Sequence, residues 1–479
     1  MKPFWQAGAS DPARPRLLLI SYHFPPGQAT GALRWQKFAG FAYQRGFELD
    51  VVTLSPHFLR QVDERRFLDL PPGTRIFGSA RTQPRLERAA AGLLRFRRSL
   101  RTAAVSAPTA RQQSNGGSQV GLVFQDELRG WSLHPRAVLL ALRAWRSFAA
   151  DDLWARDAQR VAGAIVEPGL HCAVISCGPP HAAHDAARRV ARAARLPYVM
   201  DMRDPWSLVP AVESFRASPL FYRIVGGREK AAMRQAALVV VNTPVHERLL
   251  ADRYPAAAER IISVLNGCDE EPVPPLMSDR FTIAFAGNIY IDRDPRPIFR
   301  AAARLVRERG LTPRQFAIEF LGNVDAFAGR SVLELAAENG IEGFVHVHPS
   351  RPREEALQFL ARAPMLLSLP QGVDLSIPSK IYEYMQFQAW VLALADAGSA
   401  TELVLRGTCA DVVAPDDEDA IAAVLAGRFA EYDAGVRPPR LIDRNPELKR
   451  GRQAAKFFDA LQHRLRLDTT PQEACLAAS

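Results

Sequence analysis

Short apolar runs alternate with helix-period stretches along almost the whole chain. Most of the runs are continuously apolar, as at 16–21 (RLLLIS), 172–176 (CAVIS) and 238–242 (LVVVN). Continuous apolar segments of this length are typical of strands that are buried on both faces of a sheet. Stretches such as 32–46 and 180–195 instead repeat their apolar residues at helical spacing. This alternation predicts parallel sheets flanked by helices.

The pattern begins a second time after a proline-rich stretch at 270–280 (EEPVPPLMSDR). We therefore predict an α/β protein with two Rossmann-like, doubly wound domains that face a cleft. The expected domains are 1–272 and 273–440, followed by a last helix and a loose tail within 441–479. Open α/β sheets bind ligands beyond the carboxyl ends of their strands, so we look for candidate residues there.

The composition agrees with this architecture. The 479 residues exceed what one hydrophobic core usually serves, and 48% hydrophobic with 23% charged residues is ordinary for a soluble globular protein. We find neither a secretory signal at the N-terminus nor an apolar run long enough to span a bilayer. The five cysteines are scattered without a CxxC pair, which suits a reducing compartment and does not suit a zinc site. We expect a cytoplasmic protein.

Residues 81–150 interrupt the rhythm, and we interpret them as an insertion in the first domain. Of the net charge of +10, residues 81–111 supply +7 through eight arginines and one glutamate. Within them, 84–104 mixes arginine with leucine and phenylalanine, which predicts a basic amphipathic helix that docks on an anionic membrane surface. The alternative is a solvated arm or a helix packed on its own domain. We predict no nucleic-acid partner, because no aromatic and basic module such as an RRM motif appears.

In the first domain, Gly27 and Gly31 bracket the loop between the first strand and a helix. Such a loop lets backbone amides approach a phosphate, although a plain turn has the same composition. The glycine spacing is not GxGxxG, so a dinucleotide oxidoreductase is not favoured. His181 and His184 open a later helix, where they have either a polar role at the cleft or no role beyond a surface helix.

A third strand end carries DMRDPWS (201–207). Asp201, Arg203 and Asp204 are candidates for the acceptor side, or they form a structural ion pair.

The second domain repeats the design of strand, glycine and helix. Glycine lets a ligand approach closely, and a cation beside a helix start neutralises phosphate. A lysine that opens a later helix can grip phosphate, while a glutamate one turn on accepts both hydroxyls of a ribose. The candidates here are Gly287, Asn288, Arg293, Ser379, Lys380 and Glu383.

Six segments, in this order, resemble retaining glycosyltransferase family 4, especially its members that assemble bacterial polysaccharides. They are YHFPPGQATGALRW (22–35), ISCGPPHAAH (175–184), MDMRDPW (200–206), LNGCDEE (265–271), AGNIYIDRDP (286–295) and IPSKIYEYM (377–385). The resemblance runs from residue 21 to about 415. It implies a GT-B fold with the acceptor in the first domain, the nucleotide sugar in the second, and a last helix that crosses back to the first.

The resemblance also implies roles for single residues. Arg293 and Lys380 correspond to the residues that bind the diphosphate in this family, and Glu383 corresponds to the ribose-binding glutamate. The Gly27–Gly31 loop would approach the diphosphate from the opposite domain. His181 is placed like the histidine that contacts the transferred sugar, with His184 as an open alternative.

The chain departs from the family at one position. The family usually has two glutamates separated by seven residues, and Leu375 stands eight positions before Glu383. The neighbouring Asp374 is a substitute candidate for the missing contact to the sugar.

The implied chemistry is departure of a nucleoside diphosphate, whose growing negative charge is stabilised by fixed cations and helix amides. The acceptor hydroxyl would attack on the face of the leaving group, with retention of configuration. No metal or other cofactor is called for, since no DxD-like pair stands out in the second domain. The expected partners are a nucleotide-sugar donor and a glycan or lipid-linked acceptor. The alternative is a sugar-nucleotide epimerase or hydrolase of the same architecture.

Overall fold

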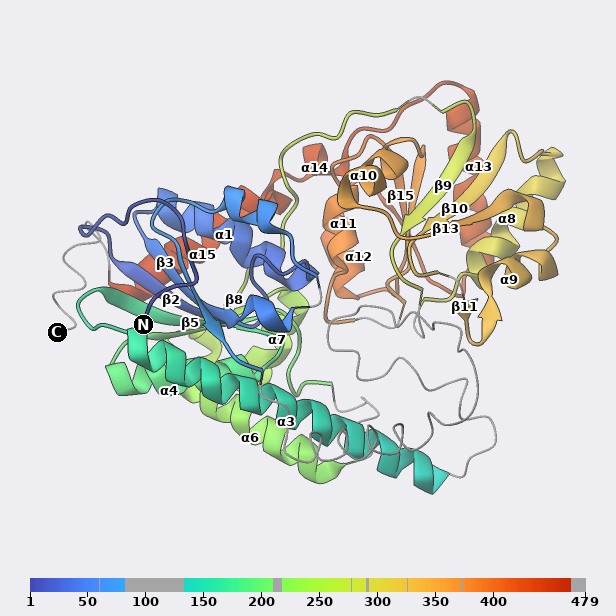
Figure 1. Cartoon of the computed structure of the whole chain (residues 1–479). Helices are drawn as coiled ribbons and strands as arrows, with labels where there is room; N and C mark the ends of the chain where they lie inside the picture. The colour runs from blue at the N-terminus through green and yellow to red at the C-terminus, as the bar shows by residue number, and fades with distance from the viewer. Residues whose placement is uncertain are drawn as a thin grey trace, which may run out of the picture.

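The computed structural model has two α/β domains (Figure 1). It describes residues 1–59, 61–81, 133–209, 218–276, 278–289, 293–324, 326–371 and 374–466. The basic segment 84–104, for which we predict membrane docking, lies outside these residues, as does the predicted loose tail, DTTPQEACLAAS (468–479). Among the described helices, none combines the length and the apolar character needed to cross a bilayer.

The first domain is built on an eight-stranded sheet with the order β1-β4-β3-β2-β5-β6-β7-β8. Only β1 is antiparallel to its neighbour, β4, and the remaining strands run parallel. The central strands are buried along their whole length, as their continuous apolar runs predict. The strands are β1 (Trp5–Gln6), β2 (Arg16–Ser21), β3 (Glu48–Leu54), β4 (Arg75–Ser79), β5 (His171–Gly178), β6 (Tyr198–Met202), β7 (Leu238–Val241) and β8 (Ile261–Ser263).

Helices cover both faces of this sheet. One face packs against α3 (Leu133–Ile165), α4 (Ala182–Ala194), α6 (Pro219–Gln235) and α7 (Pro244–Arg253). The other packs against α1 (Leu33–Gln44) and the last helix, α15 (Arg450–Leu465).

Residues 133–150, which we expected to belong to the insertion, form the first half of α3. The second half of α3 is a regular layer of the domain, because Trp154 and Ala158 are fully buried in its core. Therefore α3 is the crossover helix between β4 and β5.

The second domain has a six-stranded, fully parallel sheet with the order β13-β10-β9-β14-β15-β16. Its core is divided between two faces, one under α8, α9 and α13 and the other under α10, α11, α12 and α14. The strands are β9 (Phe281–Ala286), β10 (Phe316–Leu321), β13 (Val345–His348), β14 (Met365–Ser368), β15 (Trp390–Leu394) and β16 (Asp411–Val413), with a hairpin of β11 (Ala326–Phe327) and β12 (Arg330–Ser331). The helices are α8 (Arg296–Arg309), α9 (Val332–Glu338), α10 (Arg353–Ala361), α11 (Ser379–Tyr384), α12 (Ala400–Leu405), α13 (Glu418–Asp433) and α14 (Leu441–Arg444).

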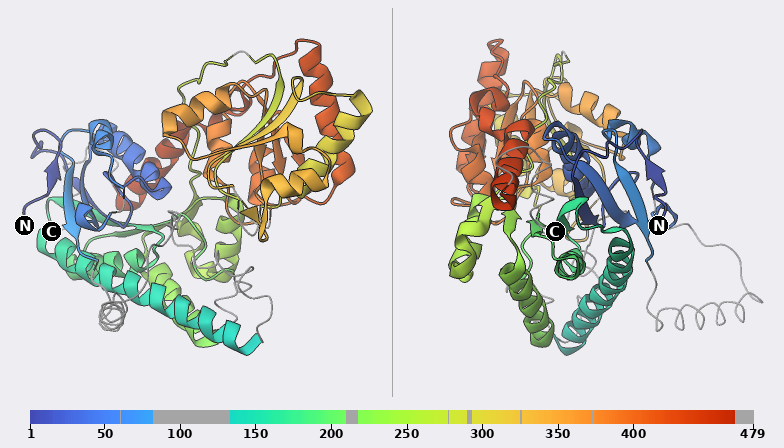
Figure 2. Two further views of the ribbon diagram at one scale, coloured as in Figure 1. Left: turned by 45° about the vertical axis from the view of Figure 1, so that its right-hand side comes forward. Right: turned by 90° about the vertical axis from the view of Figure 1, so that its left-hand side faces the viewer.

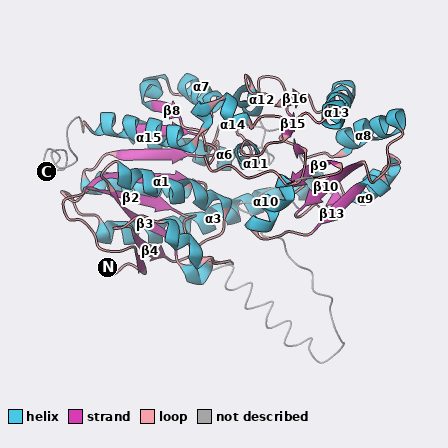
Figure 3. Cartoon of the chain, turned by 90° about the horizontal axis from the view of Figure 1, so that it is seen from above, coloured by secondary structure: helices cyan, strands magenta, loops and turns pink. Residues whose placement is uncertain are grey.

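The chain passes between the domains twice, and the two passages lie side by side (Figures 1 and 2). The backbone N–H of Cys268 on the outgoing passage donates to the carbonyl of Leu448 on the returning one, at 2.8 Å. The N–H of Arg450 donates in turn to the carbonyl of Cys268, also at 2.8 Å. The helix α15 then packs against α1, where Phe457 meets Trp35 edge to face at 5.5 Å between ring centroids. The last helix is thus part of the first domain's core. Seen from above, the strands of the second sheet lie between α10 and α11 on one side and α8 and α9 on the other (Figure 3).

A buried network of charged side chains lies at the amino ends of the strands of the first sheet. Asp50 is fully buried and accepts hydrogen bonds from Arg16 Nε at 2.9 Å and from Arg75 Nε at 2.8 Å. The imidazole of His171 lies 3.1 Å from the same carboxylate. These groups stand at the opposite sheet edge from the carboxyl ends, so we assign them a structural role. Hydrogen bonds from Arg75 and His171 and the charge of Arg16 hold the pKa of Asp50 well below its usual range, against the effect of burial.

Asp50→Ala is expected to lower the free energy of unfolding by about 3–5 kcal/mol, because Arg75 and His171 lose their shared carboxylate and the buried Arg16 keeps only Glu48 of its two carboxylate partners. The pKa is depressed in the folded state, so the stabilisation is present above the ordinary aspartate pKa. It is lost as the pH falls below about 4 toward the folded pKa. Urea unfolding between pH 3 and 7 measures both effects. Asp459→Ala is the matched control, since Asp459 pairs with Arg45 at the surface. Equal unfolding midpoints for the two variants would contradict the assignment.

Candidate functional site

The loop after β9 brings together the candidates of the second domain. Gly287 has φ +146°, a conformation that favours glycine, and its N–H donates to the carbonyl of Leu321 at 2.7 Å. A methyl group at Gly287 would overlap with the ammonium of Lys380, so glycine is required here for space as well as for its backbone angle. Lys380 Nζ also lies 4.4 Å from the centre of the Phe285 ring. The side chain of Lys380, the second residue of α11, therefore reaches back over the end of β9.

Lys380 Nζ is buried and has no hydrogen-bond partner. Burial, and next to it the positive charge of Arg293, lower the pKa of this amine to about 7, while Glu383 acts in the opposite direction. Arg293 donates from Nη1 to the carbonyl of Asn288 at 2.9 Å. Two cations thus converge on the carboxyl end of β9, and one of them has an unsatisfied amine. An uncompensated buried ammonium is costly, which makes this a place where an anion would be stabilised.

Glu383 lies one helical turn after Lys380. Its carboxylate pairs with Arg353 Nη1, at the start of α10, at 2.8 Å, and Arg353 is mostly exposed. Ser379, the first residue of α11, is exposed. The hydroxyl of Tyr384 accepts from the N–H of Ala286 at 3.2 Å, which fixes α11 against the end of β9.

In the first domain, Arg203 holds two loops together. Its Nε and Nη2 donate to the carbonyls of Gly178 and Pro179, at 3.1 and 3.0 Å. Its guanidinium also packs on Gly31, where a methyl group would overlap with it. Gly27 accepts a hydrogen bond from Arg66 at its carbonyl. The glycine loop after β2 is therefore braced from two sides.

His181 lies at the amino end of α4 and stacks on Trp206, with 5.2 Å between ring centroids and 15° between planes. Its Nδ1 is buried without a hydrogen-bond partner. Burial, followed by the effects of His246 and Arg203, lowers the pKa of His181 to about 3, so the imidazole is neutral at physiological pH. A neutral imidazole offers one donor and one acceptor.

The structure corrects two acceptor-side predictions. His184 is fully buried and its Nδ1 lies 2.7 Å from Ser176 Oγ, because α4 packs on β5 through this face. Asp201 is fully buried inside β6, where it accepts from Trp35 Nε1 at 2.8 Å and from Arg34 Nε at 3.0 Å. Neither side chain is exposed at a strand end, although Nε2 of His184 has no hydrogen-bond partner. Asp201 instead ties α1 to β6.

The remaining predicted residues lie at the surface. Asp204 is exposed, beside Arg203. Asp374 is exposed as well, and its carbonyl accepts from the N–H of Ala400 at 2.8 Å.

A contact between the domains escaped the sequence reasoning. The hydroxyl of Thr243 donates to the carbonyl of Leu375 at 2.7 Å. The same hydroxyl caps α7 by accepting from the N–H of His246 at 3.1 Å. The signal available in the sequence was NTPVHE (242–247) directly after a buried strand, since threonine before proline is a typical helix start.

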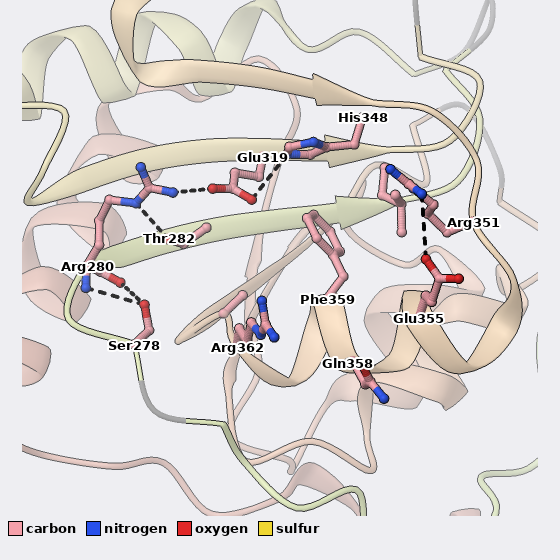
Figure 4. A pocket seen from close by; sticks show the side chains of 12 residues that line it. Ser278, Arg280, Thr282, Glu319, His348, Arg351, Glu355, Gln358, Phe359 and Arg362 are labelled. Atoms are coloured by element: carbon pink, nitrogen blue, oxygen red, sulfur yellow. Dashed lines mark hydrogen bonds and ion pairs between the residues drawn. The ribbon is translucent and has the colours of Figure 1, made fainter.

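The second domain also carries a hollow of about 490 Å³ between α10 and the strands β9, β10 and β13 (Figure 4). Its polar lining is largely paired internally: Arg280 with Glu319, His348 with Glu319 at 3.4 Å, and Arg351 with Glu355 at 3.7 Å. No residue that we predict to bind a donor lines this hollow.

No protein-family model matches the chain. The sequence is 27% identical over 162 residues to a D-inositol 3-phosphate glycosyltransferase of Saccharomonospora viridis, a match that covers 31% of this chain and 37% of that protein. The match thus spans little more than a third of this curated relative.

The fold of the chain is similar to that of solved structures over nearly its whole length. A glycosyltransferase of Rickettsia africae is 11% identical with a TM-score of 0.55, covering 95% of this chain and 100% of that one. HepE of Anabaena, in complex with UDP, is 14% identical with a TM-score of 0.50, covering 94% and 98%. At these identities the similarity concerns the fold. The chain has the α/β fold of GT-B glycosyltransferases, with two Rossmann-like domains.

Proposed function

We propose that the chain transfers a sugar, with retention of configuration, from a nucleoside diphosphate sugar to a hydroxyl of a glycan or lipid-linked acceptor. The observation that carries this proposal is the buried, unpartnered ammonium of Lys380 beside Arg293 at the carboxyl end of β9. Support comes from the GT-B fold, from the partial match to a glycosyltransferase, and from the UDP bound in a protein of this fold.

In this proposal, Lys380 and Arg293 bind the diphosphate and stabilise the charge that grows on it as the bond to the sugar breaks. The two cations supply this charge without a metal. Glu383 exchanges its exposed partner Arg353 for the hydroxyls of the ribose. The acceptor hydroxyl attacks on the leaving-group side and passes its proton to the departing phosphate, so the protein needs no nucleophile of its own.

Labelled UDP-, GDP- and dTDP-sugars, incubated with and without a cell lipid extract, test the function. A transferase moves the label into the lipid fraction only when the extract is present, and EDTA does not stop it. An epimerase or hydrolase of the same fold converts or releases the sugar without the extract. Absence of both outcomes, with no nucleotide binding, would overturn the proposal.

The pKa of Lys380 gives a pH-dependent prediction. Near pH 8 most of the amine is neutral, because its pKa is about 7. A bound diphosphate favours the charged form and raises this pKa, so the complex holds more protons than the free protein. We expect the uptake of up to about one proton per UDP at pH 8, and an affinity that falls as the pH rises above 7. Calorimetry in Tris and EPPS measures the uptake, which should vanish in Lys380→Met. The same heat in both buffers for the wild type would contradict the prediction.

A further inference from the structure

Four buried nitrogens without partners gather near the carboxyl ends of β5 and β7. They are Nδ1 of His181, Nε2 of His184, and both ring nitrogens of His246. His184 and His246 are fully buried. Each unpaired buried nitrogen costs about 1–3 kcal/mol of stability, so a protein gains nothing in folding from such a group. A cluster of them is explained most simply by a ligand that completes their hydrogen bonds.

His246 is the third residue of α7 (Pro244–Arg253) and connects two parts of the site. It is close enough to His181 that a positive charge on it would lower the pKa of His181. On its other side, the Thr243 hydroxyl accepts from the backbone N–H of His246 and donates to the carbonyl of Leu375 in the second domain. Leu375 lies four residues before Ser379, the first residue of α11, which is followed by Lys380, the residue proposed to bind the diphosphate. His246 therefore lies where the two domains touch, between the stacked His181 and the loop that leads to the diphosphate site.

The sugar of a nucleotide sugar is joined directly to its diphosphate. We place the sugar of a donor bound at Lys380 and Arg293 on the side of the Thr243–Leu375 contact, because Leu375 leads directly into α11. The loop of the second domain offers an apolar side chain at Leu375 and uses its carbonyl for Thr243. Apart from the candidate Asp374, polar contacts to the sugar would therefore come from the first domain. Burial lowers the pKa of His246 to about 4, and its neutral ring can donate to one hydroxyl oxygen and accept from another hydroxyl.

We propose that His246 is a sugar-binding residue, which forms hydrogen bonds to hydroxyls of the transferred sugar beside His181. This proposal rests on the proposed function and deepens it. A structural role for His246 makes the opposite prediction about stability, because a histidine that holds the fold together has partners to lose.

The test uses the full chain with His246→Leu and His246→Phe, which remove both nitrogens and differ in size. His246→Asn restores a donor and an acceptor, and His463→Leu is the control for a change of the same kind on the exposed face of α15. Titrations with UDP, GDP and dTDP, and with the glucose conjugate of each, separate binding of the nucleotide from binding of the sugar. Thermal unfolding without ligand reports on the structural role.

We expect both apolar variants to unfold at or above the wild-type temperature and to bind the free nucleotide within twofold of the wild type. Their affinity for the nucleotide sugar, or their kcat/KM, should fall about tenfold or more, and His246→Asn should recover part of it. Unchanged nucleotide-sugar binding in both apolar variants overturns the proposal, as does a lower Tm with equal losses for nucleotide and nucleotide sugar. A wild type that binds no nucleotide at all instead overturns the proposed function.

Discussion

Lys380→Met is expected to lower kcat by about 10²- to 10³-fold while Tm stays at or above the wild-type value. Methionine keeps an unbranched stem over Phe285 and removes the charge. The loss of activity follows because the ammonium would stabilise the charge on the departing phosphate. Stability does not suffer because Nζ has no hydrogen-bond partner in the folded protein. Assays under saturating donor, together with a thermal melt, measure the two effects.

Gly287→Ala is the companion variant for this prediction. Its methyl group would occupy the space of Lys380 Nζ, and the residue would have to hold φ +146°. It should therefore displace the ammonium and reduce activity while leaving Lys380 in the sequence, although strain also lowers its stability. Lys456→Met, on the exposed face of α15, is the control for removing a lysine charge elsewhere. A Lys380→Met enzyme with wild-type kcat would refute the role of Lys380 in holding the diphosphate.

The sequence predicted the layers of the fold because buried parallel strands leave continuous apolar runs. Two such series, separated by a proline-rich stretch, correspond to the two sheets, and β2, β5 and β7 lie where their runs predict. The limits of the insertion were harder to place. The first half of α3 comes after the arginine-rich and Ser/Gln/Gly-rich stretches, so its continuity with the buried half around Trp154 was not apparent.

The site was predictable where it depends on a local arrangement of strand end, glycine and helix start. The sequence therefore pointed to Gly287 and Lys380, but not to the contact between them, which forms only when β9 and α11 meet. Asp201 illustrates the converse. Its position at a strand end suggested an exposed carboxylate, but its partner Trp35 is 166 positions away, and only tertiary structure shows that the charge is already bound.

The prediction that His184 lies at the cleft was wrong for a related reason. The start of α4 is rich in alanine, so the sequence did not distinguish the face that packs on β5 from the face that is open. His246 was missed because a single histidine after a helix cap gives no pattern. Its significance comes from two unpaired nitrogens, and a hydrogen-bond inventory requires coordinates.

The double variant Phe457→Ala, Phe458→Ala is expected to unfold the first domain under conditions in which the wild type is folded. Both rings are fully buried on α15, and Phe457 contacts Trp35 and Phe38 of α1, with ring centroids 5.5 and 5.6 Å apart. Each truncation of a buried phenylalanine costs about 3–5 kcal/mol. Two neighbouring truncations approach the whole stability of a typical domain, about 5–15 kcal/mol.

The double variant is expected to unfold the first domain because of the path that the chain takes through the two domains. One face of the first sheet is covered by α1 together with a helix that arrives from the far end of the sequence, so the first domain completes its core only after the second has been made. Urea unfolding followed by far-UV circular dichroism measures the effect, and Lys456→Ala in the same helix should change the free energy of unfolding by less than about 0.5 kcal/mol. If the double variant unfolded at the midpoint of Lys456→Ala, α15 would be an appendage, and the first domain would have to be stable without it.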